Sequence, residues 1–230
     1  MPVVDLATVP LRSLNADLHK LPQNTNETHW TIRNPGGKHA LAVGLDAPVT
    51  VEIEGHVGYY CGGMNKEARI VVAGNAGVGV GENMMSGEIR IKGDASQAAG
   101  ATGRGGLLVI EGDASARCGI SMKGIDIVVK GSIGPMSAFM AQEGNLVVLG
   151  DAGEALGDSI YEARLFVRGT VRSLGADCAE KRGVVCAVAG MSLSGAASMG
   201  LSDAVMGGSL NTPRRCRRGN GRGCGRSRRA

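Results

Sequence analysis

The sequence predicts an all-β protein, a right-handed parallel β-helix of about seven 19-residue coils with a short helical or loop cover at its N-terminus. Two observations lead to this prediction. A glycine recurs every 19 residues, seven times in succession, and aliphatic residues stand four and two positions before each one. The glycines are Gly55, Gly74, Gly93, Gly112, Gly131, Gly150 and Gly169. A fixed period near 20 with apolar residues in register is typical of a solenoid.

The residues between these glycines favour strands over helices. In residues 88–92, apolar Ile89 and Ile91 alternate with charged residues, which is the period of a strand. Further glycines interrupt the rest of each repeat, and the leucine and asparagine offsets of a leucine-rich repeat are missing. We expect the strands to stack at about 4.8 Å per coil. The recurring glycine should turn a corner where φ is positive or the backbone is crowded. The right hand is expected from the general preference of parallel crossovers.

The first 48 residues form a lead-in that we expect to cover one end or side of the coils. A helix is expected at about residues 11–20, because Leu11, Leu14, Leu18 and Leu21 recur at helical spacing and Pro10 suits the first helical position. Residues 30–33 read as a strand and residues 34–37 as a turn. Such a cover would protect the otherwise unpaired edge of the first coil.

Composition further limits the class of protein and its expected location in the cell. Aromatic residues make up only 3% of the chain, which is low for a globular enzyme. The N-terminus lacks the basic and apolar regions of a signal peptide, and no apolar run approaches the roughly 18 residues of a membrane span. We therefore expect a cytoplasmic protein with one β-helical domain at residues 49–182.

The glycine-rich run Gly77, Gly79 and Gly81 invites a nucleotide-binding interpretation. A dinucleotide fingerprint needs GxGxxG between a strand and a helix, whose N-terminus holds the pyrophosphate. Here Met84, Met85 and another predicted strand follow instead. The run is therefore assigned to the 19-residue period.

Gly-Asp pairs such as Gly93-Asp94 and Gly112-Asp113 raise the question of calcium. A calcium-binding β-roll would need a nine-residue repeat, and the period here is 19 residues. The same corner position holds Asn75, Ser132, His56 or Thr170 in other coils. We expect all these side chains to satisfy backbone groups at the corner.

The six cysteines show no metal-binding spacing. Cys61 and Cys118 fall at the same coil position three coils apart, or roughly 14 Å, which is too far for a disulfide. They are expected to be buried thiols. The methionines of the second half of the coils are expected either to fill the core or to contribute to a partner-binding face.

A carbohydrate-active β-helix is the enzyme alternative. It would need paired carboxylates in a groove, together with aromatic residues for sugar stacking. The candidate carboxylates are Glu82, Asp126, Glu143, Asp158 and Glu162. This alternative requires Glu143, Asp158 and Glu162 to converge within about 10 Å.

Several runs carry a family resemblance: residues 56–60 through 77–87, Met122-Lys123-Gly124, residues 139–144 and residues 157–163. Over roughly residues 3–182 they resemble the GXGXG domain at the C-terminus of the glutamate synthase large subunit. A separate chain of this size looks like the β-helix subunit of three-part glutamate-synthase-like enzymes, above all of the N-methylglutamate synthase type. The coil-bearing subunit of formylmethanofuran dehydrogenase is also similar and is the alternative.

This resemblance implies a right-handed β-helix that acts as a non-catalytic scaffold and itself holds no catalytic, cofactor-binding or metal-binding residues. The implied partners are a glutamine amidotransferase-like subunit and a synthase subunit that carries FMN and an iron–sulfur cluster. The product, glutamate or N-methylglutamate, is then decided in a partner. The bulky or charged half-coils are the expected docking face, represented by Glu82, Met84, Met85, Arg104, Lys123, Gln142, Glu143, Tyr161 and Glu162.

Residues 183–230 form a tail of different composition. They contain eight arginines, one acidic residue (Asp203) and no aromatic residue. Three interpretations stay open: a nucleic-acid-binding arm, a disordered segment without a specific partner, and a shifted reading frame. The lack of interleaved aromatic residues argues against nucleic-acid binding. Relatives end in a short aromatic and basic segment that is missing here, which favours a frame shift after Arg182.

Overall fold

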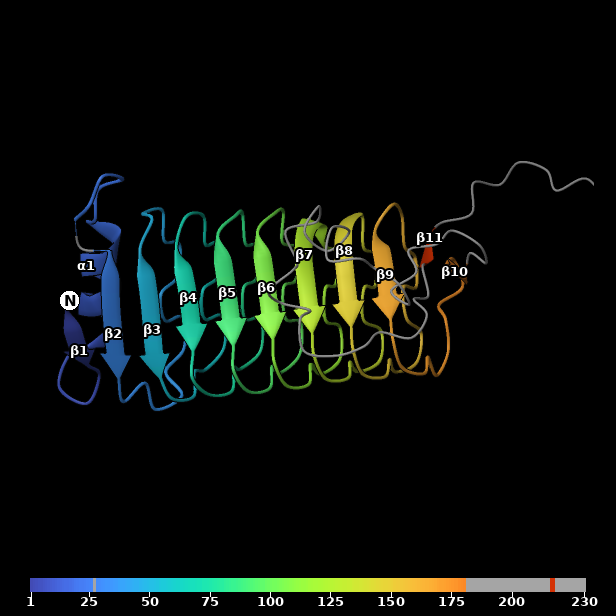
Figure 1. The fold of residues 1–230 in the computed structure, drawn as a ribbon, viewed down its shortest axis with the longest axis horizontal. Helices are drawn as coiled ribbons and strands as arrows, with labels where there is room; N and C mark the ends of the chain where they lie inside the picture. Colours follow the sequence, from blue (N-terminus) through green and yellow to red (C-terminus); the bar gives the residue numbers. More distant parts are fainter. Residues whose placement is uncertain (27, 181–215, 218–230) are drawn as a thin grey trace, which may run out of the picture.

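The computed structural model describes residues 1–26, 28–180 and 216–217. Nine strands form one sheet in chain order, and every neighbouring pair is parallel (Figure 1). The strands are β1 (Val3–Asp5), β2 (His29–Arg33), β3 (Thr50–Glu54), β4 (Arg69–Val72), β5 (Glu88–Ile91), β6 (Leu107–Ile110), β7 (Lys123–Val129), β8 (Glu143–Val148) and β9 (Arg164–Val167). A helix, α1 (Leu11–His19), lies near the N-terminal end of this row. The predicted parallel β-solenoid of about seven turns is confirmed.

The core is a stack of aliphatic side chains in register. The two inward positions of each strand lie directly over their counterparts 19 residues away, as Ile89 does over Ile70 and under Leu108. Ile70, Ile89 and Leu108 are each 0% exposed. Burial of one such side chain stabilises a fold by roughly 1.5–3 kcal/mol. Repetition of this layer in each coil therefore accounts for most of the apolar driving force.

A second, shorter ladder closes each coil on the far side of the corner. Single parallel bridges connect the residues two positions after each recurring glycine, namely Val57, Ala76, Ala95, Ala114, Ile133, Ala152 and Val171. Most of these residues are alanine, and all but the partly buried Val171 are fully buried. Small side chains there let the chain turn inward without enlarging the coil.

The lead-in joins the solenoid. Helix α1 begins and ends within one residue of its predicted bounds, and Leu14 and Leu18 are buried in the core. Asn15 fastens it to the coils: its Nδ2 donates to the carbonyl of Ala40 at 2.8 Å, and its Oδ1 accepts from the N–H of Ala42 at 3.0 Å. The predicted strand at residues 30–33 appears as β2, and the additional strand β1 pairs with it and forms the edge of the sheet.

Little of the tail is described. Strand β10 (Ala179–Glu180) pairs with β11 (Cys216–Arg217) in an antiparallel bridge, and the rest of residues 183–230 lies outside the described part of the chain. The three interpretations of the tail thus remain predictions. Across the described residues, no helix is both long and apolar enough to cross a membrane.

Candidate docking surface

The recurring glycines stand where one coil passes tightly over the next. Only Gly55 among the seven has a left-handed φ, at +138°. A Cβ on Gly112 would lie 2.1 Å from Oδ1 of Asp94, and one on Gly74 would lie 2.7 Å from the carbonyl carbon of Gly55. The N–H of Gly112 also donates to the carbonyl of Gly93 at 3.0 Å. Crowding, rather than an unusual φ, is therefore why six of these positions require glycine.

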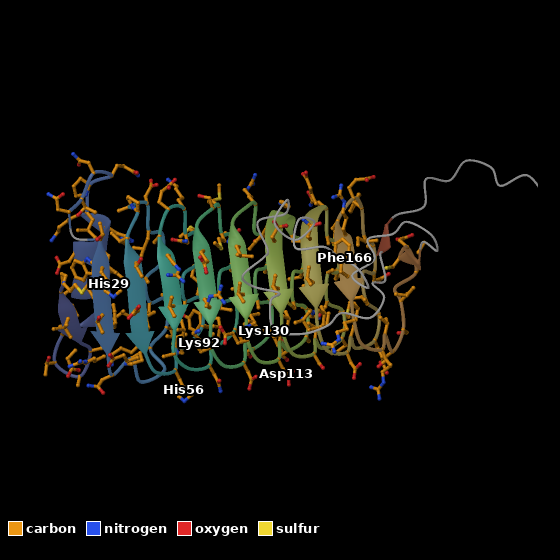
Figure 2. All side chains as sticks on the ribbon, in the orientation of Figure 1. His29, His56, Lys92, Asp113, Lys130 and Phe166 are labelled. Atoms are coloured by element: carbon orange, nitrogen blue, oxygen red, sulfur yellow. The ribbon has the colours of Figure 1, made fainter. Side chains whose placement is uncertain are left out.

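Side chains at the position directly after each recurring glycine form a continuous column of hydrogen-bond acceptors. Asp94 Oδ1 accepts from the N–H of Asp113 at 2.9 Å, and Asp113 Oδ1 accepts from the N–H of Ser132 at 2.7 Å. The acceptors of the full column are His56, Asn75, Asp94, Asp113, Ser132 and Asp151, and Thr170 ends the column as a donor to Asp151. Figure 2 shows His56 and Asp113 along the same edge of the rod. The prediction that these residues satisfy backbone groups at the corner is confirmed for these six acceptors, whereas the Thr170 hydroxyl donates to the Asp151 carboxylate.

Asp151 shows the electrostatic consequence of this column. Its Oδ1 accepts from the N–H of Thr170 at 2.7 Å and from the Thr170 hydroxyl at 2.9 Å. These two hydrogen bonds stabilise the carboxylate and lower the pKa of Asp151 below its ordinary value.

The GXGXG run is part of a recurring backbone pattern. Gly79 and Gly81 have φ of +70° and +66°, and Asn83 follows at +56°. The same three positions are left-handed in the neighbouring coils, at Tyr60, Gly62, Met64, Ala98, Gly100, Thr102, Arg117, Gly119, Ser121, Met136, Ala138, Met140, Ala155, Gly157 and Ser159. The repetition shows that this conformation builds the coil and is not special to the glycine-rich run.

Neighbouring coils hold this backbone in place. The N–H of Gly79 donates to Gln97 in the following coil at 2.9 Å, and that of Gly81 donates to Cys61 in the preceding coil at 2.9 Å. The third glycine, Gly77, has no positive φ, but a Cβ there would lie 2.5 Å from the carbonyl carbon of Gly58. The assignment of the run to the coil period agrees with this geometry.

Five of the predicted docking residues form one outward column, with one residue per coil at 19-residue spacing. They are Met85, Arg104, Lys123, Gln142 and Tyr161, which are exposed except for the half-buried Lys123. Backbone hydrogen bonds to the preceding coil set their alignment, for example from Arg104 to Met84 at 2.7 Å and from Tyr161 to Ala141 at 2.8 Å. Exposed Glu143 and Glu162 follow directly in their coils. We call these seven residues the docking column.

Two predicted docking residues lie elsewhere. Met84 is 0% exposed and belongs to the core, because its position points inward in each coil, as does that of Met122. Its inclusion in a docking face is therefore corrected. Glu82 is half-buried, and its Oε2 lies over Gly79, where a Cβ would approach to 2.7 Å. It belongs to the turn and not to the docking column.

A β-bulge interrupts the regular stack beside this column. Lys123 pairs with Glu143, but Asp126 pairs with Asn145, so β7 holds one more residue than β8 over this stretch. Gly124 and Gly144 occupy the irregular backbone, with φ of +136° and +105°. Bulges of this kind bend a strand and often lie beside functional sites. A step of 20 residues from Gly124 to Gly144, within a period of 19, was the available sequence signal.

An open hollow of about 620 Å³ lies at this bulge, at the start of β7, β8 and β9. Its lining residues are Gly124, Asp126, Gln142, Glu143, Gly144, Asn145, Glu162 and Arg164. Sequence reasoning identified Gln142, Glu143 and Glu162 as docking residues and missed Asn145 and Arg164. Within the hollow, Asn145 Nδ2 donates to Asp126 Oδ1 at 2.7 Å. The other amide atom, Asn145 Oδ1, is buried and has no hydrogen-bond partner.

The carboxylate arrangement expected of a sugar-active site is only partly present. Glu143 and Glu162 line the hollow, but Asp158 does not. Asp158 Oδ1 instead accepts from the N–H of Ala176 at 3.1 Å in the last coil. None of the residues that line the hollow is aromatic.

The outer face of the strands changes character along the rod. Over β5 and β6 it is charged: Glu111 lies 3.1 Å from Lys92, 3.4 Å from Arg90 and 3.9 Å from Lys130. Burial by itself would raise the pKa of Glu111, but these cations outweigh it, so the pKa is lower than usual. At the outward position that Arg90 occupies in β5, strands β6 to β9 instead carry apolar residues, which form a second buried cluster of Val109, Val128, Val147 and Phe166. Figure 2 labels Lys92, Lys130 and Phe166 on this face.

The two coil cysteines are buried, as predicted. Cys61 and Cys118 are free thiols with 0% exposure. Burial raises the pKa of each to about 12, because the protein interior disfavours the thiolate. Within the described part of the chain, no group of three or more histidine, cysteine, aspartate or glutamate side chains is placed to share a metal ion.

Comparison with known proteins relates the chain to a bacterial protein. No protein-family model matches the chain, and no solved structure matches it. Protein GlxC of Rhizobium meliloti (strain 1021) is 67% identical over 181 residues, which is 79% of this chain and 79% of the relative. At this identity and coverage, the chain belongs to the same family as Protein GlxC.

Proposed function

We propose that this chain is a non-catalytic structural subunit of a glutamate-synthase-like complex of the N-methylglutamate synthase type. It would hold a glutamine amidotransferase-like subunit against a synthase subunit that carries FMN and an iron–sulfur cluster. The resemblance of residues 3–182 to the GXGXG domain supports this role, and so does the parallel β-solenoid itself.

The single observation that carries the proposal is the docking column. A solenoid places equivalent residues of successive coils side by side, which creates a long surface from one sequence position. Here that surface combines apolar Met85, basic Arg104 and aromatic Tyr161. Methionine, arginine and tyrosine are enriched at protein–protein interfaces. The acceptor column at the corner, in contrast, uses its side chains for hydrogen bonds between coils.

In this proposal the redox cofactors belong to a partner. An iron–sulfur cluster is held by cysteine thiolates that converge on it. Cys61 and Cys118 are buried in the core three coils apart and do not converge on one point. The chemistry proposed for the whole complex is the transfer of ammonia or an amine to a 2-oxo acid or to glutamate. The contribution of this chain is to position the two partners relative to each other.

The test is purification of the tagged chain from its native host, with mass spectrometry of the proteins that come with it. The proposal expects an amidotransferase-like chain and a flavin/iron–sulfur chain in amounts equal to the tagged chain. Recovery of a molybdenum- or tungsten-type dehydrogenase would instead assign the chain to the formylmethanofuran dehydrogenase type of complex. A chain that is recovered alone, monomeric and colourless would contradict both and favour a free-standing binding module.

A further inference from the structure

The outward apolar residues of β6 to β9 are buried although they point away from the core. Strand side chains alternate between the two faces of a sheet, so Leu108 points into the core and Val109 points away from it. Val109 and Val128 are nevertheless 0% exposed, and Val147 and Phe166 are 8% and 6% exposed. We call Val109, Val128, Val147 and Phe166 the outer stripe.

The described residues do not account for the cover of the outer stripe. The described apolar side chains that pack against it are Leu107 of β6 and Leu149 directly after β8, which lie in the same row of strands. At the same register, β3, β4 and β5 carry Glu52, Val71 and Arg90, and none of these is buried. A sheet face of valine and phenylalanine requires a second apolar layer. That layer must come from outside the described residues.

The chain leaves and re-enters the described structure beside this stripe. It leaves at Glu180, where β10 ends, and re-enters at Cys216, where β11 begins and pairs with β10. Strand β11 also contacts β9, the strand that carries Phe166. Figure 1 shows β10 and β11 next to β9 at the end of the rod. Residues 181–215 therefore start and finish at one end of the stripe.

This segment is long enough to reach the whole stripe. The stripe spans three strand spacings, from β6 to β9, or about 14 Å. About four or five residues of extended chain cross such a distance. Residues 181–215 can therefore cross the stripe and return to β11.

The composition of the segment suits an apolar surface. Residues 184–189 are only valine, cysteine and alanine. Between Gly183 and Pro213 the one charged residue is Asp203, and the eight arginines of the tail all follow from Arg214 onward. The tail thus has an apolar part and a basic part. Soluble proteins rarely leave extended apolar surface in contact with water.

We propose that residues 184–213 of the same chain cover the outer stripe and supply its second apolar layer. A partner subunit or a second copy of the chain is the less direct occupant, because both ends of this segment already lie beside β9. The cover does not depend on the proposed scaffold function. It treats residues 184–213 as a genuine part of the fold, which neither a disordered tail nor a shifted reading frame would provide.

Photo-crosslinking of the full chain identifies what lies on the stripe. Phe166 is replaced by p-benzoyl-phenylalanine, and an equal mixture of ¹⁵N-labelled and unlabelled chains separates crosslinks within one chain from those between chains. Mass spectrometry should find peptides from residues 184–213 of the same chain. The same probe at Tyr59, an exposed aromatic residue near the other end of the rod, should not capture them.

Three outcomes of the crosslinking would overturn the cover. They are crosslinks between two chains, absence of this segment from the crosslinked peptides, and capture of a partner's peptides when the probe is used in a complex from the native host. The last outcome would reassign the stripe to a partner and leave the scaffold function standing. Failure of the chain to form any complex would contradict the scaffold function and leave the cover standing.

Substitutions in the segment test the cover without altering the sheet. Val185→Asp combined with Val188→Asp should free the stripe and lower the Tm by about 4 °C or more. The fluorescence of the dye ANS, which binds exposed apolar surface, should rise about threefold or more. Asn220→Asp combined with Ser227→Asp adds the same two charges after β11 and should change neither quantity. Equal results for the two double variants would refute the cover.

Discussion

The carboxylate of Asp94 spans one coil and accepts a hydrogen bond of 2.9 Å from the backbone N–H of Asp113. It passes directly over Gly112, where a Cβ would lie only 2.1 Å from its Oδ1. The recurring glycine and the polar residue after it therefore depend on each other in neighbouring coils. The glycine of one coil leaves room for the acceptor of the coil before it.

Removal of one acceptor should weaken the stack locally. We expect Asp94→Ala to lower the free energy of unfolding by about 1 kcal/mol, because the N–H of Asp113 loses its partner. Asp94→Asn keeps an amide oxygen in place, as Asn75 does naturally, and should stay close to the parent protein. Urea denaturation measures both. Equal losses in the two variants would show that charge, not the hydrogen bond, is what matters.

A side chain at the corner should be more damaging than the loss of an acceptor. Gly112→Val would place atoms against Asp94 and against the carbonyl of Gly93, and should cost about 1–3 kcal/mol or prevent assembly of the coils. Gly37→Ala is the control: Gly37 has φ of +70°, but nothing lies within 4 Å of its Cβ position. It should cost about 1 kcal/mol from conformation alone. A smaller loss at Gly112 than at Gly37 would contradict the crowding argument.

Asp151 should make the last coils sensitive to acid. Hydrogen bonds from Thr170 depress its pKa in the folded protein below the unfolded value of about 3.9. Its stabilising contribution is therefore present above about pH 4 and is lost as the pH falls through the lower folded pKa. Thr170→Val removes the hydroxyl donor but keeps the N–H, so the pKa of Asp151 should rise toward the ordinary value. NMR titration of the carboxyl carbon measures this, and an unchanged midpoint would exclude the hydroxyl as a cause.

The buried thiols should resist alkylation. With pKa values of about 12, Cys61 and Cys118 hold roughly one thiolate in ten thousand molecules at pH 8. Iodoacetamide should leave both unmodified in the native protein and modify both after unfolding in guanidinium chloride. Peptide mass spectrometry assigns the modified sites. Rapid modification of either residue in the folded chain would mean that its coil opens readily.

The docking column gives a prediction for the whole complex. Arg104→Glu combined with Lys123→Glu reverses two charges on this surface and should weaken partner binding about tenfold or more. Arg12→Glu on α1 changes an exposed residue at the end of the rod and should leave binding unchanged. Gel filtration and calorimetry of the purified complex compare the two. Equal effects would point to net charge and not to this surface.

The repeat period predicted the stack, because identical spacing is imposed directly by the register of parallel strands. Ile89 and Leu108 could be placed in the core from sequence alone, and they lie there. The left-handed backbone at Tyr60 and Met136 could not be predicted, since neither residue type favours it. The N–H of each donates to the following coil, to the carbonyls of Val78 and Glu154 at 2.8 Å, and these hydrogen bonds exist only once the coils are stacked.

The candidate site was less predictable for the same reason. Exposure of Tyr161 followed from its coil position, but the inward direction of Met84 depended on the details of the turn. The pairing of Asn145 with Asp126 follows the 19-residue period, but the pairing of Lys123 with Glu143 does not, because β7 holds one extra residue between Lys123 and Asp126. A period of 19 residues describes what all the coils share, so it does not predict where a single coil deviates from the pattern.

Strict register between coils also fixes the distance between two proteins that bind to different coils. Because each coil adds one strand spacing of about 4.8 Å, two proteins bound to different coils are separated by a whole number of such steps. Deletion of an entire 19-residue unit, for example from Gly93 to the residue before Gly112, would preserve every ladder and shorten this distance by one step. Deletion of a single residue would instead disturb the register between its own coil and the next one. Evolution of this family can therefore change the reach of the scaffold only in discrete increments.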